Sequence, residues 1–269
     1  MKRAHGGAFV ALHVFDRYFH SPKRYRRWAD AWTRSNLPEQ LVAMSGVYTN
    51  QAWPERVAAL EALADARLKN STFVALEIGT WFGEGSTSIW ARHLKQGSQL
   101  FLVDNWAEYI SDADKLTETA FSAMDSVHHV AINSALKKVY EFQKATGGEI
   151  FLLRGKASSV CKYFRPDSVD FVYIDGSHYY RDVVEDIRLA KSLVRDGGMI
   201  CGDDLEVEPT ESRLALARKN LDRDYIASAE EKVSFHPGVL LAVHEQFPAV
   251  KRNSAIWSVE RRGESWVPA

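Results

Sequence analysis

Residues 73–87 read FVALEIGTWFGEGST, and this stretch decides the fold. Its first residues are mostly apolar and end at Gly79, as expected for a buried parallel strand that enters a tight turn. Glycines at positions 79, 83 and 85 let the backbone turn sharply and come close to a ligand. We therefore predict a strand, a glycine turn and a helix that begins near Glu84.

Strands and helical segments alternate beyond this turn. The predicted strands are Gln99–Asp104, Glu149–Arg154, Val169–Asp175 and Met199–Gly202. This alternation predicts an α/β Rossmann-like fold with a doubly wound, mostly parallel, seven-stranded sheet. The runs Val239–Val243 and Ala255–Val259 are β-prone and are predicted to complete it, with His236-Pro237-Gly238 as the turn before a strand.

The chain is predicted to consist of a helical N-terminal extension, residues 1–70, and one catalytic domain, residues 71–269. Between the second and third strands lies an insert, residues 105–148, which is longer than a usual crossover. Its helical stretch around 136–142 and its pair His128-His129 suggest a cover over the site or a contact between two copies of the chain.

Composition excludes several classes of protein. A net charge of −1 and a pI near 6.8 give no reason to expect nucleic acid as a partner. The two cysteines, Cys161 and Cys201, lie in core-like stretches, so we expect a reducing compartment and a cytoplasmic protein. No apolar run approaches the roughly 18–20 residues needed to cross a bilayer.

Residues 1–34 nevertheless contain eight basic and two acidic side chains, a local net charge of +6. This segment could contact an anionic membrane surface or a glycan carrier. It could equally be a solvated helix face or a homo-oligomer contact, and the sequence leaves these alternatives open.

An acidic residue follows the second strand. Asp104 stands 25 positions after Gly79, where a carboxylate can accept both ribose hydroxyls of an adenosine-containing cofactor. The glycine spacing G-x-x-x-G-x-G differs from the G-x-G-x-x-G of dinucleotide folds. Glu77 would repel a pyrophosphate but could hold the α-amino group of a methionine moiety. Ser86 and Thr87 could meet its carboxylate or cap the helix. A turn that binds no ligand is the alternative.

Three carboxylates follow two neighbouring strands. Asp175 closes the fourth strand, and Asp203 and Asp204 close the fifth, so all three should share one crevice. Crowded carboxylates repel one another unless a cation or protons neutralise them, and oxygen ligands favour Mg²⁺, Ca²⁺ or Mn²⁺. We therefore predict a divalent ion that chelates two acceptor hydroxyls, with His178 as general base. Helix capping by the aspartates and an ordinary loop histidine are the alternatives.

These motifs resemble class I S-adenosylmethionine-dependent methyltransferases over residues 71–205. The resemblance rests on Glu77-Ile78-Gly79, Asp104, Val169–Asp175 and the turn Gly197-Gly198. The segments 175–178 (DGSH) and 201–204 (CGDD) are similar to bacterial methyltransferases of family 24 that modify antibiotics and polysaccharides, and to metal-dependent catechol and macrolide-sugar O-methyltransferases. Ser177 departs from the acidic residue common at this position in the macrolide-sugar enzymes, so the resemblance does not extend to this residue.

The resemblance implies a set of site residues. The expected cofactor-binding residues are Glu77, Gly79, Gly83, Ser86, Thr87, Asp104, Asn105, Trp106, Ala157, Ser158 and Asp175, with Ala157 and Ser158 framing the adenine and Trp106 stacking on it. The expected catalytic residues are His178 and Asp175. Asp175, Asp203 and Asp204 are the expected metal ligands, for Mg²⁺ first and Mn²⁺ or Ca²⁺ next.

The predicted function is therefore S-adenosylmethionine-dependent O-methylation (EC 2.1.1.-), assisted by a divalent ion. The expected acceptor is a small molecule or glycan, with a sugar hydroxyl favoured by the resemblance alone. Two alternatives stay open: an NAD-dependent oxidoreductase on the same fold, and a non-catalytic subunit that binds an adenosine ligand.

Overall fold

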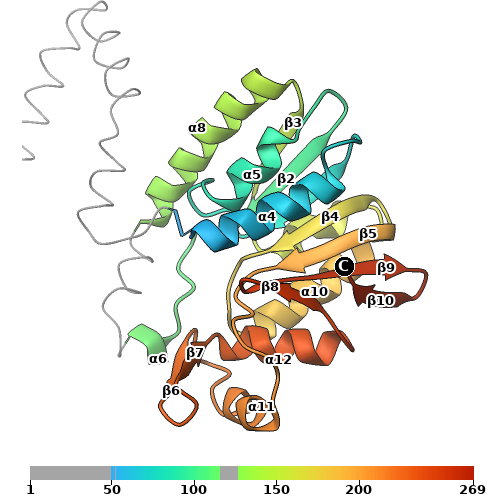
Figure 1. The fold of residues 1–269 in the computed structure, drawn as a ribbon. Helices are drawn as coiled ribbons and strands as arrows, with labels where there is room; N and C mark the ends of the chain where they lie inside the picture. The colour runs from blue at the N-terminus through green and yellow to red at the C-terminus, as the bar shows by residue number, and fades with distance from the viewer. Residues whose placement is uncertain (1–49, 52, 116–126) are drawn as a thin grey trace, which may run out of the picture. The chain divides into compact units, whose positions relative to one another are not determined.

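The structure is a computed structural model that describes residues 50–51, 53–115 and 127–269. Its centre is an eight-stranded sheet in the order β10-β9-β5-β4-β1-β2-β3, with β8 paired to β9 (Figure 1). The strands are β1 (Val74–Ile78), β2 (Gln99–Asp104), β3 (Glu149–Arg154), β4 (Val169–Ile174), β5 (Val194–Gly202), β8 (Lys251–Asn253), β9 (Ile256–Arg262) and β10 (Ser265–Pro268). β1 to β5 are mutually parallel, whereas β9 runs antiparallel to β5.

Helices cover both faces of this sheet (Figure 1). One face packs against α4 (Pro54–Arg67), α5 (Ser86–Arg92) and α8 (His128–Thr146). The other packs against α9 (Ala157–Val160), α10 (Tyr180–Leu193), α11 (Glu211–Arg218) and α12 (Pro237–Gln246). The remaining described elements are α6 (Asp112–Lys115), the 3₁₀ turn η1 (Cys161–Tyr163), and the strand pair β6 (Ile226–Ser228) and β7 (Val233–Phe235).

Strand β4 shows why the central strands read as unbroken apolar runs. Phe171 and Tyr173 are buried on the face of α4 and α5, while Val172 and Ile174 are buried on the opposite face. Successive side chains point to opposite faces, so a strand covered on both sides needs apolar residues at every position. Because β1, β2, β3 and β4 run parallel to one another, their carboxyl ends lie at the same edge of the sheet.

The fold class and the four predicted strands beyond the glycine turn are confirmed, although the sheet holds eight strands and not seven. One β prediction was wrong: Val239–Val243 lies in α12, and His236-Pro237-Gly238 is the start of that helix, not a turn before a strand. A short apolar run cannot distinguish a buried strand from a helix buried on all sides, and Pro237 suits the first turn of a helix. The second run, Ala255–Val259, coincides largely with β9.

The insert has two described parts. Helix α8 is longer than the predicted 136–142 stretch and packs against α5 and β3 as the crossover helix. Residues 107–109 and His128 line the pocket described below. Helix α4 belongs to the predicted N-terminal extension, yet its Leu60 and Ala64 are buried in the core beside α5. The basic segment, residues 1–34, lies outside the described residues.

No helix in the described ranges is both long and apolar enough to cross a bilayer.

Candidate active site

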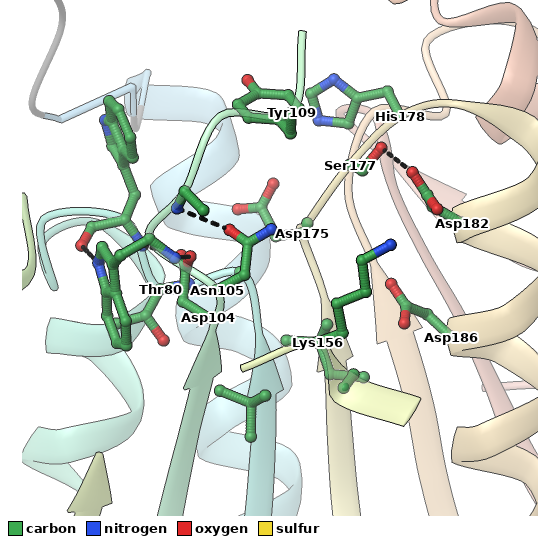
Figure 2. A pocket seen from close by; sticks show the side chains of 18 of the residues that line it. Thr80, Asp104, Asn105, Tyr109, Lys156, Asp175, Ser177, His178, Asp182 and Asp186 are labelled. Atoms are coloured by element: carbon green, nitrogen blue, oxygen red, sulfur yellow. Dashed lines mark hydrogen bonds between the residues drawn. The ribbon is translucent and has the colours of Figure 1, made fainter. Parts of the chain in front are cut away.

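A pocket of about 440 Å³ lies at the carboxyl ends of the central strands (Figure 2). The turn after β1, the residues after β2, the start of α9 after β3 and the turn after β4 all contribute to its wall. Ligands bind at this edge of open α/β sheets because the loops that leave neighbouring strands separate there. The pocket therefore lies at the sheet edge where the site was predicted, and several of the predicted residues line it.

Gly79 allows two of these turns to touch. Its φ is +90°, and a Cβ atom built there would lie 1.9 Å from the carbonyl oxygen of Asp175. The Asp175 N–H also donates to the Ile78 carbonyl at 2.8 Å. No residue with a side chain fits this contact, so glycine is required for the turns after β1 and β4 to meet.

Asp104 lines the pocket and accepts hydrogen bonds from three backbone N–H groups around it. Its Oδ2 accepts from the backbone N–H groups of Thr80 and Trp81 at 3.0 and 2.8 Å, and its Oδ1 accepts from that of Trp106 at 2.8 Å. Burial raises the pKa of Asp104, while these three donors act in the opposite direction. Asp104 lines the pocket as expected, and it also fixes the glycine turn. Its contact with a ribose stays a prediction.

Glu77 lies beneath the pocket and not in its lining. Ser86 Oγ and Thr87 Oγ1 donate to its two carboxylate oxygens at 2.5 and 2.7 Å. Burial raises the pKa of Glu77 to about 8 against the effect of these two hydrogen bonds. Ser86 lines the pocket, whereas Gly83 and Thr87 do not. A Cβ atom at Gly83 would lie 3.0 Å from the Cα of Ala135 in α8. Their predicted contacts with the methionine moiety stay predictions.

The other predicted cofactor residues, Asn105, Trp106, Ala157 and Ser158, all line the pocket. The Trp106 ring is buried, and its Nε1 donates to the Trp81 carbonyl at 2.9 Å. Lys156, Asp182 and Asp186 were not predicted, and they also line the pocket (Figure 2). Burial, then repulsion by Asp182 and Glu185, raises the pKa of Asp186 to about 7. The signal that could have identified these three residues is that they lie close in the sequence to predicted site residues.

Asp175, Asp203 and Asp204 meet as predicted, with one carboxylate oxygen from each within 4.8 Å of the others. A cation from the protein already lies among them. Nη2 of Arg56 is 2.9 Å from Asp175 Oδ2 and also forms an ion pair with Asp203 Oδ2. Burial opposes the charge of Arg56, but Asp175 raises its pKa above the ordinary value. Arg56 was not predicted, because α4 lies far from β4 and β5 in the chain.

The predicted metal group does not fit an ion while Arg56 is in place. Asp203 Oδ2 additionally accepts from the Tyr173 hydroxyl at 3.0 Å, and its Oδ1 accepts from the Asp204 N–H at 2.7 Å. Both oxygens of Asp203 thus have partners, and a guanidinium nitrogen contacts two of the three carboxylates. An ion between Asp175 and Asp203 would have to displace Arg56.

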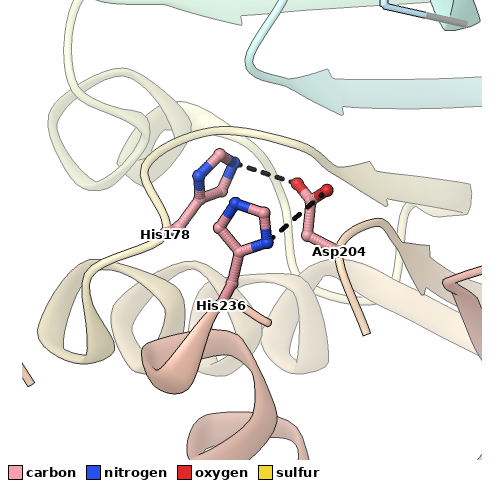
Figure 3. Close-up of side chains that lie close together, drawn as sticks. All are labelled: His178, Asp204 and His236. Atoms are coloured by element: carbon pink, nitrogen blue, oxygen red, sulfur yellow. Dashed lines mark ion pairs between the residues drawn. The ribbon is translucent and has the colours of Figure 1, made fainter. Parts of the chain in front are cut away.

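His178 is part of a second group, with Asp204 and His236 (Figure 3). Its Nε2 lies 3.0 Å from Asp204 Oδ2 and its Nδ1 lies 2.9 Å from Asp224 Oδ1. Burial alone would lower the pKa of His178, but Asp224 and Asp204 raise it well above the ordinary value. Both ring nitrogens have carboxylate partners, so neither is free to accept a proton from a substrate in this arrangement. The assignment of His178 as general base stays a prediction.

Comparison with known proteins agrees with this geometry. Residues 76–205 match the family model described as a methyltransferase domain. Residues 76–205 of this chain are therefore an S-adenosylmethionine-dependent methyltransferase domain. The family predicted from the sequence is thereby confirmed, and the match spans the strands and turns that form the pocket, from β1 to the Asp203-Asp204 pair.

Solved structures show the same fold at low sequence identity. The O-methyltransferase TomG of Streptomyces achromogenes, in complex with S-adenosylmethionine, is 17% identical, with 85% of this chain and 89% of that chain covered and a TM-score of 0.53. An O-methyltransferase from Bacillus cereus, in complex with S-adenosylhomocysteine, is 17% identical, with coverages of 84% and 90% and a TM-score of 0.50. No curated protein sequence shows significant similarity to this methyltransferase.

Proposed function

We propose that this methyltransferase transfers the methyl group of S-adenosylmethionine to a hydroxyl oxygen of a small-molecule or glycan acceptor. The observation that carries the proposal is the pocket itself, in which the Gly79 turn, Asp104 and Asp175 face one cavity at the strand ends. The choice of oxygen as acceptor is supported by similarity to TomG and the Bacillus cereus enzyme, both described as O-methyltransferases.

Methyl transfer to oxygen needs two events. The acceptor oxygen forms a bond to the methyl carbon as the bond from that carbon to sulfur breaks, which leaves S-adenosylhomocysteine. The hydroxyl proton must pass to a base, and the oxygen must lie in line with the sulfonium methyl. The protein therefore has to orient the acceptor and accept one proton.

Asp175 is the residue best placed for the proton. Its carboxylate lines the pocket at the end of β4 and its Oδ2 is held by Arg56 at 2.9 Å. Burial raises the pKa of Asp175, although Arg56 acts in the opposite direction, so its carboxylate is a stronger base than an exposed aspartate. Arg56 fixes the orientation of this carboxylate and offsets the charge that it shares with Asp203.

In this proposal, a divalent ion can bind only at a position that Arg56 does not occupy. The predicted set of Asp175, Asp203 and Asp204 is already bridged by the guanidinium, and Mg²⁺, Mn²⁺ or Ca²⁺ would compete with it. We therefore propose that Arg56, and not Mg²⁺, supplies the positive charge beside Asp175.

The two alternative functions differ in measurable ways. Glu77 lies outside the lining, so the glycine spacing is what argues against the pyrophosphate of NAD. Calorimetric titration with S-adenosylhomocysteine and with NAD⁺ separates the methyltransferase from the oxidoreductase, since only one ligand should bind at micromolar concentration. A non-catalytic subunit would bind the adenosine ligand without turnover.

The test is a methyl-transfer assay with a panel of catechols, vicinal diols of sugars and phenolic natural products, in which S-adenosylhomocysteine formation is measured. We expect turnover with at least one hydroxyl acceptor, and a fall in kcat of about 100-fold or more for Asp175→Asn. The matched control is Asp196→Asn, an aspartate of β5 outside the pocket lining. Unchanged kcat in Asp175→Asn would remove this residue from proton transfer.

A further inference from the structure

A group of two histidines and several carboxylates lies beside the pocket, and the proposed methyl transfer does not use most of it. His178 lines the pocket, whereas Asp204 and His236 lie outside the lining. One ligand atom from each of these three residues lies within 4.8 Å of the others. The His178 and His236 rings are 4.3 Å apart between centroids.

The backbone is built to hold this group together. A Cβ atom at Gly238 would lie 2.2 Å from the His178 carbonyl oxygen and 2.4 Å from the Tyr180 nitrogen, so only glycine lets the start of α12 pack against this loop. This contact places His236, two residues earlier, beside His178. Asp204 completes the group from the end of β5, with a φ of +62° that is unusual for a residue with a side chain.

Each imidazole has a carboxylate partner of its own. Asp224 Oδ1 lies 2.9 Å from His178 Nδ1, and Glu206 Oε1 lies 2.5 Å from His236 Nδ1. Histidines that bind metal ions usually have such a partner at the other ring nitrogen, and His178 has this arrangement, with Asp224 at Nδ1 and Asp204 at Nε2. At His236 one nitrogen, Nδ1, faces both Glu206 and Asp204. Asp204 contacts both rings, at 3.0 Å from His178 Nε2 and 3.8 Å from His236 Nδ1.

The charges and the ligand atoms of this group indicate which kind of ion it could bind. Three carboxylates, Asp204, Asp224 and Glu206, surround two imidazoles, and a divalent cation would offset this negative charge. Nitrogen and oxygen ligands lie about 2.0–2.2 Å from a zinc ion, so atoms of one ligand shell lie roughly 3–4 Å apart. Small side-chain movements from the present spacing would suffice. Imidazole ligands favour zinc and other transition metals over Mg²⁺.

We propose that His178, Asp204 and His236 form a binding site for a divalent transition-metal ion, held by Asp224 and Glu206 and separate from the pair of aspartates that Arg56 bridges. The site would open towards the pocket through His178. The proposed metal site does not depend on which acceptor the enzyme methylates, so binding of the ion can be tested without an acceptor.

The experiment is titration of the full-length, EDTA-treated and dialysed protein with Co²⁺, followed by calorimetry and visible absorption. We expect one Co²⁺ per chain, with paramagnetically shifted proton signals from two imidazoles in the wild type. His236→Ala and His178→Ala should each weaken binding at least about 10-fold. The control variant His129→Ala, an exposed histidine of α8, should bind as the wild type does.

Circular dichroism checks that each variant is folded, and the imidazole signals of the wild type decide the question if both histidine variants unfold. The proposal is overturned if the wild type binds no Co²⁺, if no imidazole signals shift, or if both folded histidine variants bind normally. It is also overturned if Asp175→Asn abolishes binding, because the ion then lies among the aspartates. Binding of S-adenosylhomocysteine, measured in parallel, reports separately on the proposed function.

Discussion

Arg56 and Asp175 are 119 positions apart in the sequence, yet Arg56 Nη2 lies 2.9 Å from Asp175 Oδ2. The same nitrogen also pairs with the buried Asp203, so one side chain of α4 links the carboxylates that close β4 and β5. This relationship explains how acidic residues can crowd one edge of the sheet, and it ties α4 to the active site.

Arg56→Ala should destabilise the protein by about 3–5 kcal/mol, because it leaves the buried carboxylate of Asp203 and the half-buried carboxylate of Asp175 without their cation. Urea unfolding followed by circular dichroism measures the change. Arg92→Ala is the control, since its pair with Glu61 is exposed and should contribute at most about 1 kcal/mol. Equal effects of the two substitutions would show that the Arg56 bridge is not important for stability.

Gly79→Ala should unfold the pocket or abolish cofactor binding. The added methyl group would overlap the Asp175 carbonyl oxygen, in addition to the strain of a φ of +90°. Gly147→Ala separates the two effects: its φ is +72°, but nothing lies within 4 Å of the added atom, so only about 1–2 kcal/mol of strain is expected. Thermal melts and titration with S-adenosylhomocysteine measure both. A Gly79→Ala protein that binds as well as Gly147→Ala would contradict the described contact.

Glu77 should make the stability of the protein depend on pH. Its pKa in the folded protein is about 8, above the ordinary value of 4.5, so the folded state binds this proton more tightly than the unfolded state does. The stabilisation is therefore complete below pH 4.5 and is lost as the pH rises through about 8.

Glu77→Gln removes this titration, so its free energy of unfolding should fall less between pH 5 and pH 9 than that of the wild type. Each unit of pKa shift corresponds to about 1.4 kcal/mol. Urea unfolding at several pH values gives both curves. Parallel curves for the two proteins would show that Glu77 ionises normally.

Mg²⁺ should not stimulate methyl transfer by the EDTA-treated enzyme, because Arg56 already pairs with both Asp175 and Asp203 and the histidine group favours other ions. The assay compares initial rates with and without added Mg²⁺, using an acceptor identified from the panel. Loss of activity on chelation that Mg²⁺ alone restores would instead support the ion predicted from the sequence.

The strands and the acids at their ends could be predicted because they depend on local patterns. An apolar run that ends in Gly79 or Asp175 indicates a buried strand, and parallel strands bring their carboxyl ends together. Helix α12 could not be predicted, because a run of apolar residues such as 239–243 fits a buried helix equally well. Arg56 was not predicted, and His236 was predicted in a turn before a strand, for a different reason: both approach the site through helix packing, which no local pattern encodes.

The most direct test of the central claim is a crystal structure with S-adenosylhomocysteine bound. We predict the ligand in the pocket beside the Gly79 turn, with its ribose near Asp104, its adenine near Ala157, and its sulfur facing Asp175. A ligand bound elsewhere on the protein, or a pocket in which Asp104 and Asp175 face different cavities, would contradict the account.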